Sequence, residues 1–463
     1  MKTRVEKDSL GKKEIPAEAY YGAETARALE NFPISGVRFH PDLTWAFAMI
    51  KKACARANAS LGKLDSRRAK AIVKACDEIL AGKVRDQFVT DSIQSGAGVS
   101  AHMNVNEVIA NRALEILGRK KGDAAYLHSH DHVNKGQSTN DVVPTAIRLA
   151  ALKGLEPFYH SSRSLEKAFA QKAAQFRRVV KSGRTHMQDA APITLGQEFG
   201  GWARQLEKGR ARVKGLAENL LELGIGGSAV GTGLNTTLAC RKKVIANLKS
   251  QTGFPVKGAA NLFEVMQSDA DLAGVSGGLR DYALSLLQIS NDLRLLSSGP
   301  KTGFAEINLP ARQPGSSIMP GKVNPVMPEV TAQAAYQVMG NDAAVAFAAG
   351  AGQLELNVMR PVIARNLLES VEILKNVTRV LRTFCIEGIT ANPARCREYA
   401  ETSYGIAAAL NPYIGYNRAA ECVKESVKTG RTLREIVLQK KLLTPAQLDR
   451  ILSPENLTRP KSR

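Results

Sequence analysis

The chain has 463 residues, which is long for a single core and suggests two or three domains. Its apolar content of 44% is ordinary for a globular protein, and no uninterrupted apolar run approaches the ~20 residues that span a bilayer, so we expect no membrane partner. The net charge is +21, but the basic clusters are short, scattered and not interleaved with aromatic residues. Nucleic-acid binding is therefore disfavoured, and a solvated basic surface or attraction of an anionic substrate accounts better for the charge.

Six cysteines stand far apart in the chain, with no CxxC motif and no Cys/His spacing typical of a metal site. In a chain of this size they indicate reduced, mostly buried thiols in a cytoplasmic protein. Residues 1–22 contain no apolar segment of the kind found in signal peptides, so we expect no signal peptide. The sequence predicts neither a metal centre nor a cofactor.

The first half of the chain is mostly helical in pattern. Residues 20–39 are the best place for short strands, because few runs anywhere alternate with a period of two residues. Residues 150–214 have a helical pattern, interrupted at residues 182–196 by a loop that contains glycine and proline. The segment GIGGSAVGTG, residues 224–233, resembles a phosphate-binding loop only superficially, because it follows a helical pattern and lacks GKS or GKT.

Three further helices are predicted in the second half. Residues 281–296 form one that stops before Ser298-Gly299-Pro300, a helix C-terminus signal. Residues 330–349 are alanine-rich and are predicted to be helical despite Gly340. Between residues 361 and 388 the apolar residues recur at steps of three and four, which marks one face of a long helix. Such long helices are typical of a helical bundle.

The sequence changes in character past residue 393. The segment TLREIVLQKKLLTPAQLDRIL predicts two short helices. For the second, Thr444 fits an N-cap, Pro445 fits the first helical position, and Gln447 completes a capping box. We therefore expect a small, separate C-terminal unit.

Four short stretches are unusually polar within these helical surroundings: residues 94–107, 132–141, 183–189 and 313–329. Ser138, Thr139 and Asn140 come directly before a helical pattern, where their side chains and the first backbone N–H groups can converge on an anion. Simple capping of that helix explains the same residues. Each of the other stretches also has an ordinary structural explanation. Residues 94–107 fit a glycine turn that leads into a polar helix start, residues 183–189 a loop histidine that is only hydrogen-bonded, and residues 313–329 a surface loop rich in turn residues.

The stretch QPGSSIMPGKVNPVMPE, residues 313–329, allows a more specific chemistry. A serine alkoxide forms only where the site stabilises its charge, and Lys322 and the amides of the loop glycines are available for this. Such an alkoxide can remove a carbon-bound proton. A carbanion beside a carboxylate becomes an aci-carboxylate, and the Ser, Thr, Asn and Lys residues of the polar stretches supply donors for it. This elimination needs no metal.

The four stretches together resemble the motifs of the aspartase/fumarase superfamily, whose signature loop is GSSIMPGKVNP. The resemblance covers nearly the whole chain and includes YYGAETARALENF, LRLLSSGP, GQLELNVM and LNPYIGY. It implies a mainly α-helical subunit with a central long-helix bundle and three domains, at residues 1–140, 141–393 and 394–463. It also implies a homotetramer in which three subunits share each active site. The expected substrate is a small dicarboxylate or amino acid of the succinyl type, and the usual product is fumarate.

The resemblance also implies roles for individual residues. Ser316 corresponds to the general base, and Lys322 and Asn324 correspond to ligands of a substrate carboxylate. His186 corresponds to a catalytic residue near the leaving group, which Glu329 supports in fumarases. The remaining substrate contacts that it implies are Val99, Ser100, Ser138, Thr139, Asn140, Thr185, Ser317 and Met319. Among these, Ser138 and Thr139 correspond to hydroxyls that hold the carboxylate beside the deprotonated carbon.

The motifs QSTND, VNPVMPE and PAEAYYG favour the aspartase branch, in which L-aspartate gives fumarate and ammonia, over class II fumarases. Four positions depart from this pattern. Val99 stands where both branches usually have Thr, Ala101 also departs, His102 stands where the family usually has Asn, and Arg360 where aspartases usually have Glu. The alternatives are a class II fumarase acting on malate, a related C–N lyase with another substrate, and a protein that keeps the fold only as a structural or binding partner.

Overall fold

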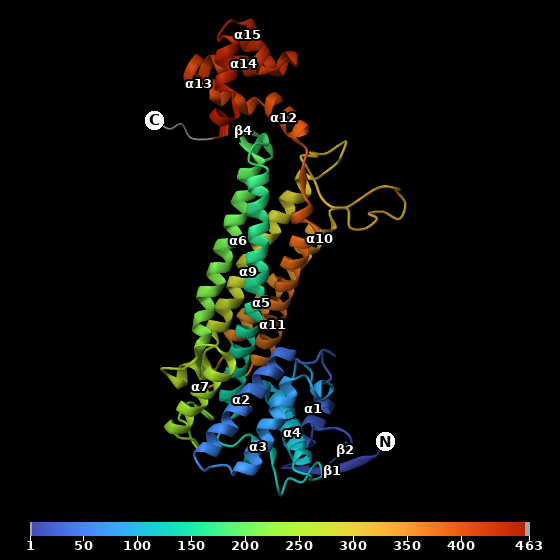
Figure 1. Ribbon diagram of the computed structural model, residues 1–463, viewed down its shortest axis with the longest axis vertical. Coiled ribbons are helices and arrows are strands. Elements are labelled where there is room, and N and C mark those ends of the chain that lie inside the picture. Colours follow the sequence, from blue (N-terminus) through green and yellow to red (C-terminus); the bar gives the residue numbers. More distant parts are fainter. Residues whose placement is uncertain (1, 459–463) are drawn as a thin grey trace. The chain divides into compact units, whose positions relative to one another are not determined.

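Five long helices dominate residues 2–458, the part of the chain that the computed structural model describes (Figure 1). They are α5 (Thr139–Gln175), α6 (Leu195–Ala217), α9 (Ala270–Leu296), α10 (Val326–Ala349) and α11 (Arg360–Phe384). The predicted helices at residues 281–296 and 330–349 are confirmed as parts of α9 and α10, and the one predicted between residues 361 and 388 is confirmed as α11, which ends at Phe384. Gly340 does not interrupt α10, because neighbouring helices bury one face of it.

The chain divides into two compact units, and the boundaries between them fall inside these five helices. Unit 1 comprises the N-terminal residues up to Tyr159 together with residues 211–283 and 336–375. Unit 2 comprises residues 160–210, residues 284–335 and the residues from Asn376 onward.

Helices of unit 1 pack through both aromatic and polar contacts. The rings of Phe158 on α5 and Tyr282 on α9 meet edge to face, with centroids 5.1 Å apart. Ser276 on α9 donates a hydrogen bond to Asp342 on α10, at 2.6 Å. Because such buried polar pairs form only when helices lie close together in one register, they help to fix how these helices pack.

Unit 1 also contains shorter helices and strands. They are β1 (Thr3–Asp8), β2 (Gly11–Pro16), α1 (Ala23–Asn31), α2 (Pro41–Ser60), α3 (Ser66–Leu80), α4 (Val99–Ile116), β5 (Glu222–Leu223), α7 (Leu238–Thr252), β6 (Lys257–Gly258) and α8 (Leu262–Gln267). Strands β1 and β2 form an antiparallel hairpin that pairs Thr3 with Pro16. The prediction of short strands at residues 20–39 was wrong, since this segment contains α1 and the hairpin precedes it.

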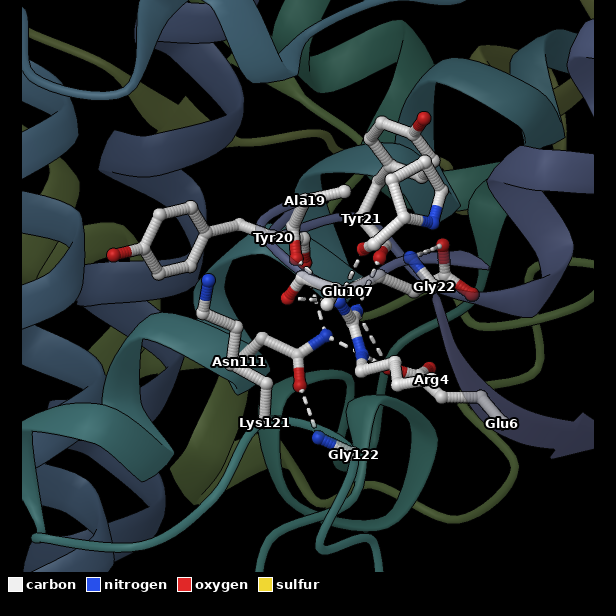
Figure 2. A network of polar contacts seen from close by, with 12 residues as sticks. Arg4, Glu6, Ala19, Tyr20, Tyr21, Gly22, Glu107, Asn111, Lys121 and Gly122 are labelled. Carbon is white, nitrogen blue, oxygen red and sulfur yellow. Dashed lines mark hydrogen bonds and ion pairs between the residues drawn. The ribbon is translucent and has the colours of Figure 1, made fainter. Parts of the chain in front are cut away.

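A contact with a distant residue explains why α1 begins where it does. The buried carboxylate of Glu107, on α4, accepts hydrogen bonds from the backbone N–H groups of Gly22, Glu24 and Thr25 and from the Thr25 hydroxyl, at 2.6–3.1 Å. Figure 2 shows Glu107 at the centre of this network, beside Gly22. Burial raises the pKa of Glu107 to about 7, and these donors act in the opposite direction. The acid that caps α1 thus lies 85 residues from Gly22 in sequence, outside any local signal.

Unit 2 contains a hairpin where the sequence predicted a loop. Strands β3 (Val180–Thr185) and β4 (Gln188–Thr194) pair antiparallel, so the loop prediction for residues 182–196 was wrong. The turn consists of His186 and Met187, both in the left-handed backbone region, with φ of 55° and 60°. Two left-handed residues make the turn that matches strand twist in hairpins. Asn-Gly or Asp-Gly usually announces that turn, and neither dipeptide occurs here.

The C-terminal helices of unit 2 include a core that residues between 406 and 451 form. They are α12 (Pro393–Thr402), α13 (Ala407–Ile414), α14 (Tyr416–Thr429), α15 (Leu433–Gln439), α16 (Pro445–Ile451) and α17 (Pro454–Thr458). Cys422, Ile436 and Leu448 are among the buried residues of this core. The predicted capping box of Thr444 and Gln447 is confirmed, as are the two predicted short helices, α15 and α16.

All six cysteines are free and buried, as predicted. Within residues 2–458, the helices are each too short or too polar to cross a membrane.

Candidate active site

The signature loop lies in unit 2, between the short strand β7 (Ile307–Asn308) and α10. It closes on itself: the Gly315 N–H donates to the Lys322 carbonyl, and the Asn324 side-chain amide donates to the Gly315 carbonyl, both at 2.8 Å. A Cβ at Gly315 would lie 2.7 Å from the Asn324 nitrogen and the Lys322 oxygen. Only glycine therefore permits this close approach.

Ser316 lies at the start of a tight turn in this loop. Its Oγ accepts hydrogen bonds from the backbone N–H groups of Ile318, at 3.2 Å, and Met319, at 2.9 Å. Two amides that converge on one oxygen stabilise negative charge there, as in an oxyanion hole. The expectation that glycine amides would do this was wrong, since the donors belong to Ile318 and Met319.

A cleft of ≈ 930 Å³ in unit 2 brings several candidate residues together. Lys322, Asn324 and Glu329 all line it, together with Ser298 and Arg294 at the end of α9. Lys322 is exposed and Asn324 is half-buried, so both side chains are accessible to a small anion. Ser317 and Met319 lie on the exposed outer part of the loop.

Thr185 and His186 lie at the tip of the β3–β4 hairpin, also in unit 2, and both are exposed. His186 has a left-handed backbone conformation, which costs a residue with a Cβ of order 1 kcal/mol or more. Such strained residues are concentrated at functional sites, and the turn places His186 at the hairpin tip.

Ser138, Thr139 and Asn140 lie in unit 1, where α5 begins. Ser138 Oγ accepts the Asn140 N–H at 3.2 Å, so Ser138 caps this helix, as the structural explanation of these residues predicted. The next residue, Asp141, is buried and accepts the N–H groups of Ser138, Gly226 and Ser228 at 2.9–3.0 Å. Burial raises the pKa of Asp141 to about 6. The glycine-rich loop at residues 224–233 thus contacts a carboxylate of the chain itself at Gly226 and Ser228.

Val99 and Ser100 begin α4, close to the start of α5 within unit 1. A Cβ at Gly98 would lie 3.1 Å from Val143 on α5, so glycine allows the two helix starts to approach. Ser100 Oγ lies 2.8 Å from Ser95 Oγ. Val99 is 39% exposed, unusually open for a valine at the start of a helix.

Arg360, one of the departures from the aspartase pattern, is fully buried at the start of α11. Its Nε faces the buried Asp269 carboxylate at 3.2–3.3 Å, and its two Nη groups face the backbone carbonyls of Asn140, Val265 and Met266. Burial lowers the pKa of Arg360, and Asp269 opposes that shift. Arg360 is therefore a buried ion-pair partner that holds the first turn of α5.

Several buried residues that contact the candidate site residues or their neighbours were missed by the sequence analysis. Asp141, Asp269 and Lys51 were not singled out, and His102 was noted only as a departure from the family pattern. Lys51 did carry a signal, because it stands in a largely apolar stretch of sequence and lysine is rarely buried without partners. Among residues 2–458, no group of three or more His, Cys, Asp or Glu side chains is arranged to hold a metal ion.

Long packed helices place this protein in the helical class, and its signature loop directs two backbone amides at a serine oxygen. Comparisons with known proteins identify the family to which the protein belongs. A family model described as Lyase matches residues 11–340, and one described as Fumarase C C-terminus matches residues 406–459. The chain belongs to this lyase family.

Its relatives include several aspartate ammonia-lyases. The chain is 50% identical to that of Bacillus subtilis, over 99% of this chain and 96% of the relative, and 47% identical to that of Escherichia coli, with the same coverage. Among solved structures, a fumarate lyase from Brucella melitensis has a TM-score of 0.96 at 47% identity, covering 99% of this chain and all of that one. A class II fumarase from Schistosoma mansoni has a TM-score of 0.93 at 38% identity, covering 98% of both chains.

Proposed function

We propose that the protein is an aspartate ammonia-lyase, which converts L-aspartate to fumarate and ammonia. The observation that carries the proposal is the identity of 47–50% with aspartate ammonia-lyases over 99% of the chain. The solved class II fumarase is less similar, at 38% identity. Arg360, which stands where aspartases usually have Glu, had counted against this proposal. Because Arg360 is buried and paired with Asp269, it has a structural role that does not conflict with the proposed activity.

The proposed reaction begins at Ser316. Its alkoxide, stabilised by the amides of Ile318 and Met319, forms an O–H bond with the proton taken from the β-carbon of aspartate. The electrons of the broken C–H bond pass into the neighbouring carboxylate and give an aci-carboxylate. When that intermediate collapses, the C–N bond breaks, the carbon–carbon double bond forms, and the amine leaves. Lys322 and Asn324 bind one carboxylate, Ser138 and Thr139 bind the other, and His186 lies near the amine.

The test of the proposed function follows fumarate by its ultraviolet absorbance, with purified protein and either L-aspartate or L-malate. We expect fumarate to form from L-aspartate and not from L-malate. Turnover of L-malate alone would identify the protein as a class II fumarase. Turnover of neither would support a related C–N lyase or a protein that retains only the fold, and would refute the proposal.

Replacing Val99 with threonine should raise kcat/KM for L-aspartate by about tenfold, because it restores one hydrogen bond to a charged substrate. Valine and threonine have nearly the same shape, so the fold should be preserved. Val99→Ala, which shortens the side chain without adding a hydroxyl, is the matched control and should give no gain. Steady-state kinetics measure both variants, and an unchanged kcat/KM in Val99→Thr would show that the missing hydroxyl is unimportant.

We further propose a homotetramer of three-domain subunits, with each active site shared between subunits. The support is an apolar surface on α10, where Phe347 is 83% exposed and Tyr336 is 58% exposed in the isolated chain. Exposed large apolar groups of this kind mark interfaces. The buried free thiols support the cytoplasmic location expected from the sequence.

A further inference from the structure

A buried lysine lies directly behind the proposed substrate-binding hydroxyls of unit 1. Lys51, on α2, is fully buried, and its Nζ has three hydrogen-bond partners: Asn134 Oδ1 at 2.8 Å, Gln137 Oε1 at 2.9 Å and His102 Nε2 at 2.7 Å. An ammonium group has three protons to donate and no lone pair to accept with. The three partners therefore match its capacity, which explains how a lysine is tolerated in the core.

The orientation of the two amides is fixed by their other contacts. The side-chain nitrogen of Asn134 donates to the backbone carbonyl of Gln137, at 3.2 Å, and that of Gln137 donates to the carbonyl of Val133, at 3.1 Å. Because both nitrogens are used in this way, both amide oxygens face Lys51. The third proton of the ammonium group then points to His102 Nε2, which also lies 3.3 Å from the side-chain nitrogen of Asn106, so two donors face Nε2 and it acts as an unprotonated acceptor.

The His102 ring is neutral, and its proton is therefore on the other nitrogen. The ring is fully buried and stacks on Phe47, with centroids 5.8 Å apart. Burial and the neighbouring Lys51 charge hold the pKa of His102 well below its usual value. With Nε2 accepting from Lys51, the proton resides on Nδ1, which lies 2.7 Å from Thr139 Oγ1. The imidazole thus donates to the Thr139 hydroxyl, and the hydroxyl proton remains free for another acceptor.

We propose that His102 is a positioning residue that directs the Thr139 hydroxyl proton toward the substrate carboxylate, and that Lys51 selects the imidazole tautomer this requires. The inference rests on the proposed function, because the carboxylate is the one that becomes the aci-carboxylate during elimination. Charge on that group increases in the transition state, so a correctly directed hydroxyl contributes more to kcat than to KM. Burial lowers the pKa of Lys51 to about 7, and the nearby Cys54 and Asp141 act in the opposite direction.

Two amide substitutions separate the two contacts of the imidazole. In His102→Asn, the amide nitrogen takes about the place of Nδ1 and can still donate to Thr139. In His102→Gln, the amide lies farther out, about where Nε2 was, so its oxygen can accept from Lys51 but the donor to Thr139 is lost. We expect His102→Gln to have a kcat/KM for L-aspartate about tenfold below that of His102→Asn, mostly through kcat.

A purely structural role for His102 predicts the reverse order. If its task were only to satisfy the buried Lys51, His102→Gln would be the more stable and more active variant, and that result would overturn the proposal. The same two substitutions in a Thr139→Val background provide the second measurement. The difference between them should vanish there, because the hydroxyl through which His102 acts is absent; a persistent difference would also refute the inference.

Neutron diffraction from crystals of the unmodified enzyme tests the tautomer without relying on any variant. A deuteron on Nδ1 of His102 agrees with the proposal, and a deuteron on Nε2 would contradict it. Turnover of L-aspartate by the unmodified enzyme decides the proposed function separately. An active enzyme with the Nε2 tautomer would therefore refute this inference while leaving the proposed function intact.

Discussion

Ser316→Ala is expected to lower kcat for L-aspartate by about a thousandfold or more, because it removes the proposed base for the β-proton. The serine oxygen is also the acceptor for the Ile318 and Met319 amides, so no other group at that position can hold the negative charge. Fumarate formation under saturating substrate measures the effect. Activity near that of the unmodified enzyme would exclude Ser316 as the base.

The matched control is Ser317→Ala, in the neighbouring and more exposed serine. Its proposed contact is with bound substrate only, so we expect a rise in KM and a much smaller change in kcat. Light scattering should show the same oligomer for both variants and the unmodified protein. If Ser316→Ala failed to form the oligomer, its loss of activity would be a consequence of failed assembly. The kinetic result would then give no support to Ser316 as the base.

Arg360→Met is expected to lower the free energy of unfolding by about 3–5 kcal/mol, because it leaves Asp269 buried without its partner. Both side chains are almost fully inaccessible, at 0% and 1% exposure. Burial already raises the pKa of Asp269, and Arg360 is the main influence that lowers it. Urea denaturation followed by circular dichroism measures the loss.

The double variant Arg360→Met/Asp269→Leu is the control for this prediction. Removing both charges avoids the uncompensated carboxylate, and pairs of this kind are often replaced by apolar residues at little cost. We therefore expect the double variant to be more stable than Arg360→Met alone. If the single variant were as stable as the unmodified protein, the ion pair would have no role in holding α11 to the start of α5.

The long helices were predictable because periodicity is a local property. In α11 the apolar residues recur every three or four positions, and the predicted end of α9 before Ser298 is correct. The capping box at Thr444 likewise depends on neighbours three residues apart. The starts of helices were less predictable: α9 begins at Ala270, 11 residues before the predicted start at residue 281. Gly277 and Gly278 lie between the two positions, and the helix continues through them because a Cβ at Gly278 would lie 2.8 Å from Leu216, so glycine allows close packing there.

Some errors arose because a distant residue decides the local structure, and others because the local sequence carries no recognised signal for the structure that forms. The start of α1 depends on Glu107, and the β3–β4 hairpin depends on a turn at His186 and Met187 that no Asn-Gly or Asp-Gly signal announces. In the signature loop, sequence pointed to a charge-stabilised serine. It could not show that the amides of Ile318 and Met319 are the donors, because backbone N–H groups are present at nearly every position.

By itself the sequence determined the helical class, and it predicted the signature loop with its serine base and the elimination chemistry that such a loop supports. These follow from the residue types and short spacings that physical chemistry constrains locally. Only the tertiary structure decided what the departures from the family pattern do. Arg360 is paired with Asp269, and His102 lies between Lys51 and Thr139. A buried polar group must find partners wherever the fold provides them, and those partners stand 37 to 91 residues away along the chain.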